Sequence, residues 1–226
     1  MKKLMLTVCL VLGLLIAPMA MALQVQTTGG AGYGPYQTGS GGEFTFIPSD
    51  GLEWVLNAGY VDTVTKNVLG LSGTFQTFCV EHGEFVYPNT KFDVALSQNS
   101  IYTGKPLTLG AAWLYHQFQI GQLQGYDYGS RTTVQALQDA IWYFMGVGTH
   151  DLNNPFIVLG DANGALTPNQ GQIPVAVINI WALGHLNEYD YRRQDMLVCV
   201  PEPGILILLG LAMSAIGIAA PFVRKI

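Results

Sequence analysis

Alternating apolar and polar residues, interrupted by glycine, proline and aspartate, predict several short β-strands in the first half of the chain. In the longest of them, Phe75, Thr77 and Cys79 share one face, while Phe78 and Val80 share the other. The strands that this pattern predicts cover residues 43–47, 52–56, 61–65, 73–81 and 84–87.

The middle of the chain has apolar residues at helical spacing. Thr108 can cap a helix that runs through Ile120, and Ser130 can cap a second helix that runs through about Met145. A proline suited to a first helical turn, followed later by a glycine stop, predicts a third helix over residues 174–183.

A final strand is predicted over residues 189–200, so the chain order is strands, then helices, then a strand. This order favours an α+β fold, with an antiparallel β-sandwich or barrel-like core and an inserted helical subdomain. The stretch that ends at Gly42 is rich in glycine, serine and threonine, which predicts a flexible leader over residues 23–42. The folded domain is then expected to occupy residues 43–200.

The N-terminal residues have the pattern of a secretory signal peptide. Lys2 and Lys3 precede an apolar run over residues 4–17, and Ala20 and Ala22 then give the small-x-small pattern of a cleavage site. We therefore expect residues 1–22 to be removed after Ala22 and the mature protein to be exported.

The C-terminal residues are those of a membrane-spanning helix. Residues 204–223 include no charged side chain, and a helix of this length can cross about 30 Å of hydrocarbon. The basic stub 224–226 follows at once, and the positive-inside rule keeps such a stub in the cytoplasm. The expected topology places the folded domain outside the cytoplasm, held at the membrane by one span.

Composition narrows the possible functions. Charged residues make up 11 % of the chain and hydrophobic residues 50 %, which excludes a disordered protein. Residues 23–203 hold six basic and fifteen acidic side chains, so their net charge is 6 − 15 = −9. An acidic domain without a basic stripe is a poor partner for nucleic acid. The four histidines are far apart and lack zinc-site spacing, and no motif calls for a metal or cofactor.

The residues just before the predicted span form a motif. Pro201, Glu202 and Pro203 precede the apolar helix and the basic cluster. This arrangement over residues 201–226 resembles the PEP-CTERM sorting signal. The resemblance implies an exosortase-type processing enzyme as partner and transient residence in the inner membrane, with the folded domain in the periplasm. It also implies release to the cell surface or to an extracellular or biofilm matrix.

Two cysteines remain after removal of the signal peptide. In an oxidising compartment the default expectation for Cys79 and Cys199 is a disulfide. Such a bridge would close a loop of about 120 residues, worth ~5 kcal/mol in the chain-entropy model. A free Cys79 is the other simple alternative.

A second motif pair gives a different expectation for Cys79. The string Thr77-Phe78-Cys79-Val80-Glu81 is followed by Ala136-Leu137-Gln138-Asp139-Ala140-Ile141-Trp142 on the second predicted helix. The two strings resemble the thioester domains of bacterial surface adhesins. That resemblance implies that the sulfur of Cys79 and the side-chain carbonyl of Gln138 form an internal thioester.

Helical spacing independently places Gln138 on or beside the buried stripe, since it lies four residues after Val134 and three before Ile141. A buried amide without a partner costs about 1–3 kcal/mol, so Gln138 needs one. Glu81 and His82 are candidates to polarise the carbonyl and accept protons, and Trp142 is a candidate to shield the bond from water.

The resulting expectation is a protein that attaches covalently, once and without turnover, to an amine- or hydroxyl-bearing polymer or protein. It is therefore not expected to be an enzyme. Two alternatives stay open. One is a non-reactive structural protein of the extracellular matrix, and the other is a carbohydrate-binding module that uses exposed tryptophan or tyrosine.

Overall fold

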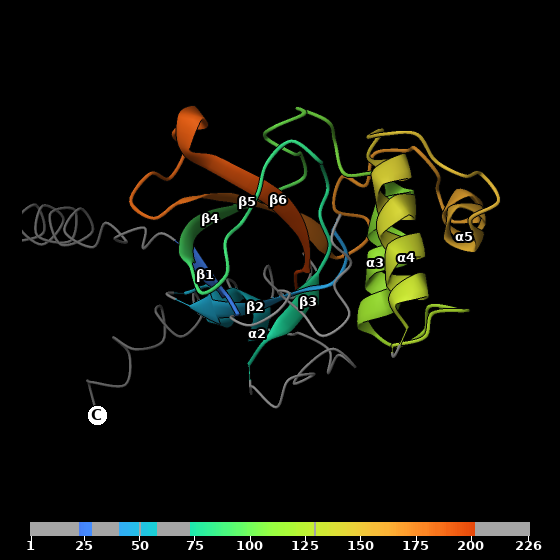
Figure 1. Cartoon of the computed structure of the whole chain (residues 1–226), viewed down its shortest axis with the longest axis horizontal. Coiled ribbons are helices and arrows are strands. Elements are labelled where there is room, and N and C mark those ends of the chain that lie inside the picture. The colour runs from blue at the N-terminus through green and yellow to red at the C-terminus, as the bar shows by residue number, and fades with distance from the viewer. Residues whose placement is uncertain (1–22, 29–40, 50, 58–72, 129, 202–226) are drawn as a thin grey trace, which may run out of the picture.

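The computed structural model describes residues 23–28, 41–49, 51–57, 73–128 and 130–201 of the 226-residue chain. These residues form a mixed α+β fold built on one six-stranded antiparallel sheet with the order β3-β2-β1-β4-β5-β6 (Figure 1). The strands are β1 (Leu23–Thr27), β2 (Phe44–Ser49), β3 (Phe75–Thr77), β4 (Lys91–Ser97), β5 (Val175–Ala182) and β6 (Arg192–Cys199).

The sheet curls until its two edges meet. Beyond the end of β3, the N–H of Val80 donates to the carbonyl of Asp195 at 3.1 Å, and the N–H of Leu197 donates to the carbonyl of Phe78 at 3.2 Å. The hydroxyl of Thr77 donates to the carbonyl of Leu197 at 2.5 Å. The core is therefore a nearly closed barrel, and residues 77–81 form the seam along β6.

Three helices are inserted between β4 and β5 and pack on one side of the barrel (Figure 1). They are α3 (Leu109–Gln119), α4 (Arg131–Phe144) and α5 (Pro155–Ala162). The predicted helical insertion is thus present. Thr108 caps α3 as expected, since its hydroxyl accepts from the N–H of Ala111 at 3.3 Å. Ser130 occupies the N-cap of α4 without a side-chain capping bond.

Two buried clusters share the barrel wall. One fills the barrel and includes Val25, Phe46 and Cys79. The other lies between the barrel and the helices and includes Phe78 and Leu137. The seam strand contributes to both clusters because successive side chains of an extended chain point to opposite faces.

The strand predicted over 52–56 is wrong, because these residues belong to the short helix α2 (Leu52–Asn57). Leu52 and Leu56 are both buried, and in a helix residues four apart share a face. The carboxylate of Glu53 accepts from the N–H of Gly51 at 3.1 Å and supports the first turn. A short apolar run does not distinguish strand from helix by periodicity.

The helix predicted over 174–183 is also wrong, because β5 covers residues 175–182. This strand pairs with β4 on one side and β6 on the other, and seven of its eight residues are buried. A strand buried on both faces reads as a continuous apolar run rather than an alternating one. The prediction missed α5, although Asn154 caps it and Pro155 occupies its first turn.

Two smaller expectations also need correction, and three fall on segments outside the described residues. Residues 23–27 form β1 in the middle of the sheet, so the predicted leader does not begin at residue 23. Residues 84–87 form no strand. The segments 1–22, 61–65 and 204–226 lie outside the described residues. Within the described ranges, no helix combines the length and apolar character needed to span a bilayer.

Candidate functional site

The side-chain amide of Gln138 is bonded to the backbone of Cys79. Its Oε1 accepts from the N–H of Cys79 at 3.0 Å and from the N–H of Gly42 at 2.9 Å. Its Nε2 donates to the carbonyl of Cys79 at 2.8 Å. Both Gln138 and Cys79 are fully buried. The structure thus brings together the two residues that the sequence motifs single out.

This amide occupies a gap in the β2–β3 ladder. The pairing joins Phe44 with Thr77 and Phe46 with Phe75, so the residue numbers of each pair sum to 121. Continuing the register by two residues would place Gly42 opposite Cys79, again with the sum 121. The strands separate there, and α4 inserts Gln138 between them. One glutamine amide therefore replaces the missing ladder bonds of two strands.

Two glycines make room for the insertion. Gly41 and Gly42 have φ angles of +115° and +102°, where residues with a Cβ are strained. A Cβ on Gly41 would lie 2.8 Å from two ring carbons of Trp142 and 3.2 Å from Cγ of Gln138. Both glycines belong to the segment that was predicted to be a flexible leader. The available signal was a Gly-Gly pair directly before a predicted strand, which is typical of a close backbone approach.

The thiol of Cys79 lies beside this amide. Burial raises the pKa of the thiol well above its ordinary value, and the negative charge of Glu81 raises it further. Hydrogen bonds from the N–H groups of Cys79 and Gly42 to the sulfur lower this pKa in part. These two N–H groups also donate to Oε1 of Gln138. At neutral pH the sulfur is held as a thiol.

The pair of donors on Oε1 has the geometry of an oxyanion hole. Two backbone N–H groups at 2.9 and 3.0 Å would stabilise negative charge that develops on this oxygen when a nucleophile adds to the carbonyl carbon. Because backbone groups are fixed by the sheet, they are already oriented before any reaction. The arrangement is therefore suited to acyl transfer at the side chain of Gln138.

Trp142 covers the site one helical turn after Gln138. It is only 5 % exposed, and its ring lies against Gly41 on one side and His82 on another, with 3.9 Å between the His82 and Trp142 ring centroids. Partial burial and the neighbouring His150 lower the pKa of His82, so its imidazole is neutral at pH 7. His82 is exposed and lies on the solvent side of Trp142.

The carboxyl group of Glu81 bonds residues at the barrel seam, not the side-chain amide of Gln138. Its Oε1 accepts from the N–H of Asp195 at 2.6 Å, and its Oε2 accepts from the hydroxyl of Ser100 at 2.9 Å. Burial raises the pKa of Glu81 to about 9, and the nearby carboxylate of Asp195 adds to the shift. Burial also raises the pKa of Asp195, although the N–H of Ile101 partly offsets this. The prediction that Glu81 polarises the Gln138 carbonyl gains no support from these bonds.

A second buried acid was missed by the sequence analysis. Glu43 directly follows Gly42 and is 1 % exposed. Burial raises the pKa of Glu43 to about 8, more than the neighbouring hydroxyl of Tyr126 offsets. A neutral carboxylic acid thus lies one residue from the oxyanion-type donor. No sequence pattern indicated that this acid would be buried.

The structure does not join Cys79 to Cys199. The backbone of Cys79 pairs with that of Met196 across the seam. Cys199 lies three residues further along β6, which is roughly 10 Å at the usual rise of a strand. Bridged cysteines need Cα atoms within about 7 Å. The two also lie in different clusters, Cys79 inside the barrel and Cys199 facing the helices. The disulfide alternative is therefore not supported.

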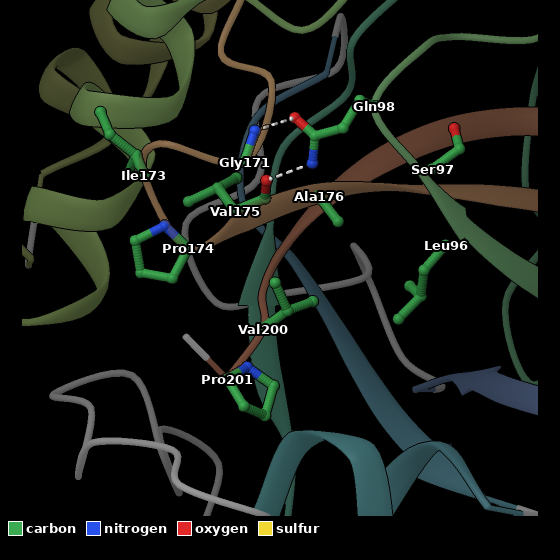
Figure 2. Close-up of a pocket in the computed structure, with 10 residues that line it drawn as sticks. All are labelled: Leu96, Ser97, Gln98, Gly171, Ile173, Pro174, Val175, Ala176, Val200 and Pro201. Atoms are coloured by element: carbon green, nitrogen blue, oxygen red, sulfur yellow. Dashed lines mark hydrogen bonds between the residues drawn. The ribbon is translucent and has the colours of Figure 1, made fainter. Parts of the chain in front are cut away.

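The predicted sorting motif is described only at Pro201, because Glu202 and Pro203 lie outside the described residues. Pro201 lines an apolar hollow of about 330 Å³ at the end of the barrel where β6 ends (Figure 2). Gln98 borders this hollow and bonds the N–H of Gly171 at 3.3 Å and the carbonyl of Val175 at 2.9 Å. No acid, base or thiol lines it, so it offers no acid–base chemistry.

Within the described residues, no group of three or more histidine, cysteine or acidic side chains is placed to bind a metal ion. No family model, curated protein or solved structure matches this chain. The function must therefore be inferred from the geometry of Cys79, Gln138 and the residues around them.

Proposed function

We propose that Cys79 and Gln138 form an internal thioester, through which the exported protein attaches covalently to a surface or matrix partner. One observation supports this most directly: the Gln138 amide bonds both the N–H and the carbonyl of Cys79, and its carbonyl oxygen lies between two backbone N–H donors. Sealing by Trp142 supports it further, because an activated acyl group must be kept from water.

Bond formation is an exchange at one carbon. The sulfur of Cys79 bonds to Cδ of Gln138, and the bond from Cδ to Nε2 breaks. The thiol proton passes to the departing nitrogen, which leaves as ammonia. The N–H groups of Cys79 and Gly42 stabilise the charge that builds on Oε1 while the carbon is tetrahedral. The high thiol pKa means that the proton must be removed as attack proceeds, since only the thiolate is strongly nucleophilic.

In the attachment step the sulfur of Cys79 is the leaving group, and an amine of the partner is the nucleophile. An amine of the partner bonds to Cδ, the bond from Cδ to sulfur breaks, and a proton from the amine returns to the sulfur. The product is an amide between Gln138 and the partner, and Cys79 is again a thiol. His82 lies on the solvent side of Trp142 and is neutral at pH 7, so it is placed to accept a proton from an incoming nucleophile.

Intact-mass spectrometry of the purified mature protein tests the bond. The expected mass is lower than the sequence mass by one ammonia, and both Cys79→Ala and Gln138→Ala restore the full mass. Matched controls are Cys199→Ser, which changes the other cysteine, and Gln135→Ala, which changes a glutamine that bonds Asp139 on the same helix. Both controls should keep the deficit. A full mass in fresh protein, or a deficit that survives Cys79→Ala, would exclude the thioester.

We further propose that the two terminal segments supply the route to the surface. The signal peptide over residues 1–22 directs export, and the span over 204–223 holds the protein in the inner membrane. An exosortase-type enzyme then acts near Pro201, Glu202 and Pro203. Fractionation of cells that express the full chain tests this step. Glu202→Ala should leave the protein in the membrane fraction, and equal release of variant and parent protein would contradict the sorting role.

A further inference from the structure

Exposed aromatic rings are concentrated on neighbouring loops of the barrel. All five exposed large aromatic side chains in the described part of the chain lie between β3 and β4, between β4 and α3, or between β5 and β6: Phe85, Tyr87, Tyr102, Tyr189 and Tyr191. The β5–β6 connection lies on the side of the barrel away from the helices (Figure 1). Folding into a core does not account for rings that stay between 41 % and 68 % exposed.

Contacts between the loops hold several of these rings in place. The guanidinium of Arg192 lies 3.8 Å from the ring centroid of Tyr189 and 5.3 Å from that of Tyr102. Arg192 also forms a 3.1 Å ion pair with Glu84 and donates to the carbonyl of Tyr189 at 2.7 Å. The loop that holds Tyr102 touches the preceding loop closely, because a Cβ on Gly83 would collide with the Tyr102 ring. Three loops are thus joined through one arginine.

A second stack lies on the β5–β6 connection. The rings of His185 and Tyr191 are parallel within 8°, with their centroids 3.6 Å apart, and His185 Nδ1 lies 3.2 Å from the carboxylate of Glu188. Despite these contacts, Tyr189 stays 59 % exposed and Tyr191 41 % exposed. Rings ordered in this way lose little conformational freedom when they bind a partner.

A hollow of about 370 Å³ is lined by residues of the same β3–β4 and β5–β6 connections and of the adjoining strands. Its lining includes Tyr87, Asn89 and Lys91 from one side and Leu183 and Arg193 from the other. The volume lies within the range of small-molecule sites, about 300–1,000 Å³. The aromatic surface therefore includes both flat rings and a recess bordered by polar side chains.

The charges on this surface balance. Lys91, Arg192 and Arg193 are its basic residues, and they are matched by Glu84, Glu188 and Asp190. A balanced set disfavours a strongly charged polymer of either sign, because neither would gain from long-range attraction. It does suit a ligand with many hydroxyl groups, since carboxylates accept from hydroxyls and guanidinium groups donate to them.

We propose that this aromatic surface, defined by Tyr102, Tyr189, Tyr191, Arg192 and the hollow beside Tyr87, binds a neutral β-linked polysaccharide. A pyranose ring with equatorial substituents has a flat C–H face that packs on an exposed aromatic ring, while its hydroxyls meet the polar side chains around it. The site goes beyond the covalent reaction and does not depend on it. It lies near enough to assist, because Arg192 is four residues, roughly 13 Å, along β6 from the partner of Cys79.

Native affinity electrophoresis tests this proposal with hydroxyethylcellulose in the gel as the neutral β-linked probe. Dextran, alginate and chitosan serve as α-linked, anionic and cationic comparisons. The Cys79→Ala variant is used throughout, so retardation cannot arise from covalent attachment. We expect hydroxyethylcellulose to retard it, and the double variant Tyr189→Ala/Tyr191→Ala to weaken binding at least tenfold. Tyr189→Phe should keep binding, since it preserves the ring.

Leu152→Ala is the matched control, because Leu152 is exposed to a similar extent and lies in the helical insertion. Circular dichroism of each variant establishes that it is folded before its binding is compared. Absence of retardation by hydroxyethylcellulose would overturn the proposal, as would equal retardation of the double tyrosine variant. Binding confined to alginate or chitosan and lost at high salt would show a charge interaction instead. Each of these outcomes leaves the mass test of the thioester unaffected.

Discussion

Gly41→Ala is the substitution that most directly tests how the backbone and Gln138 fit together. At a φ of +115°, a residue with a Cβ carries strain of about 1–3 kcal/mol. The added Cβ would also lie 2.8 Å from the Trp142 ring, and overpacking of this kind costs about 1–3 kcal/mol. Together these effects predict a loss of about 2–6 kcal/mol in the free energy of unfolding.

Gly104→Ala separates the two contributions. Gly104 also has a positive φ, +68°, but a Cβ there would meet no atom within 4 Å. We expect it to lose only about 1–2 kcal/mol, the cost of left-handed backbone. Urea unfolding followed by tryptophan fluorescence and circular dichroism gives both values. Because a displaced Trp142 would admit water, Gly41→Ala should also show less of the ammonia deficit. Equal destabilisation by the two variants would refute the close packing of Gly41 on Trp142.

Three further predictions concern the residues around the site. Gln138→Ala leaves the N–H groups of Cys79 and Gly42 and one carbonyl unpaired in the interior, so unfolding free energy should fall by at least about 3 kcal/mol, and a loss within error would contradict the inserted amide. Trp142→Ala should speed hydrolysis of the thioester at pH 7, measured as recovery of mass by one water over time, and an unchanged rate would remove the shielding role. The raised pKa values of Glu43, Glu81 and Asp195 mean that the folded state binds more protons than the unfolded state, so their contribution to stability is complete below about pH 4 and is lost as pH rises towards 9. Glu81→Gln should flatten this dependence in urea unfolding across that range, and an unchanged slope would refute the contribution of Glu81.

The sequence predicted the helical part of the site well. The α4 stripe and its start at Ser130 follow from helical periodicity, and that periodicity alone is enough to place Gln138 towards the interior. Local physics determines these features, since the spacing of side chains on a helix is fixed by 3.6 residues per turn. The pairing of Cys79 with Gln138 was implied by the resemblance of two short strings to thioester domains, and the two residues are adjacent in the structure. Whether the bond forms stays a prediction.

The sequence predicted the glycine side of the site poorly. Gly41 and Gly42 resemble any flexible glycine pair until the β2–β3 register shows that Gly42 would face Cys79. Glu43 resembles a surface acid until the barrel buries it. The errors at 52–56 and 174–183 have a similar cause. Packing against the rest of the fold made the first segment a helix and the second a strand buried on both faces. The conformation or burial of each of these residues depends on segments that are distant in the sequence.

The sequence by itself determined the acidic, weakly charged character of the domain, the two helices that follow Thr108 and Ser130, and the position of Gln138 on the inner side of the second helix, because composition and periodicity are local properties. Tertiary structure alone decided that β1 lies in the middle of the sheet, that the seam at Cys79 meets β6, and that a gap between two strands receives the Gln138 amide. Strand order and register depend on which distant segments pair, and pairing energy arises only once the whole sheet has closed.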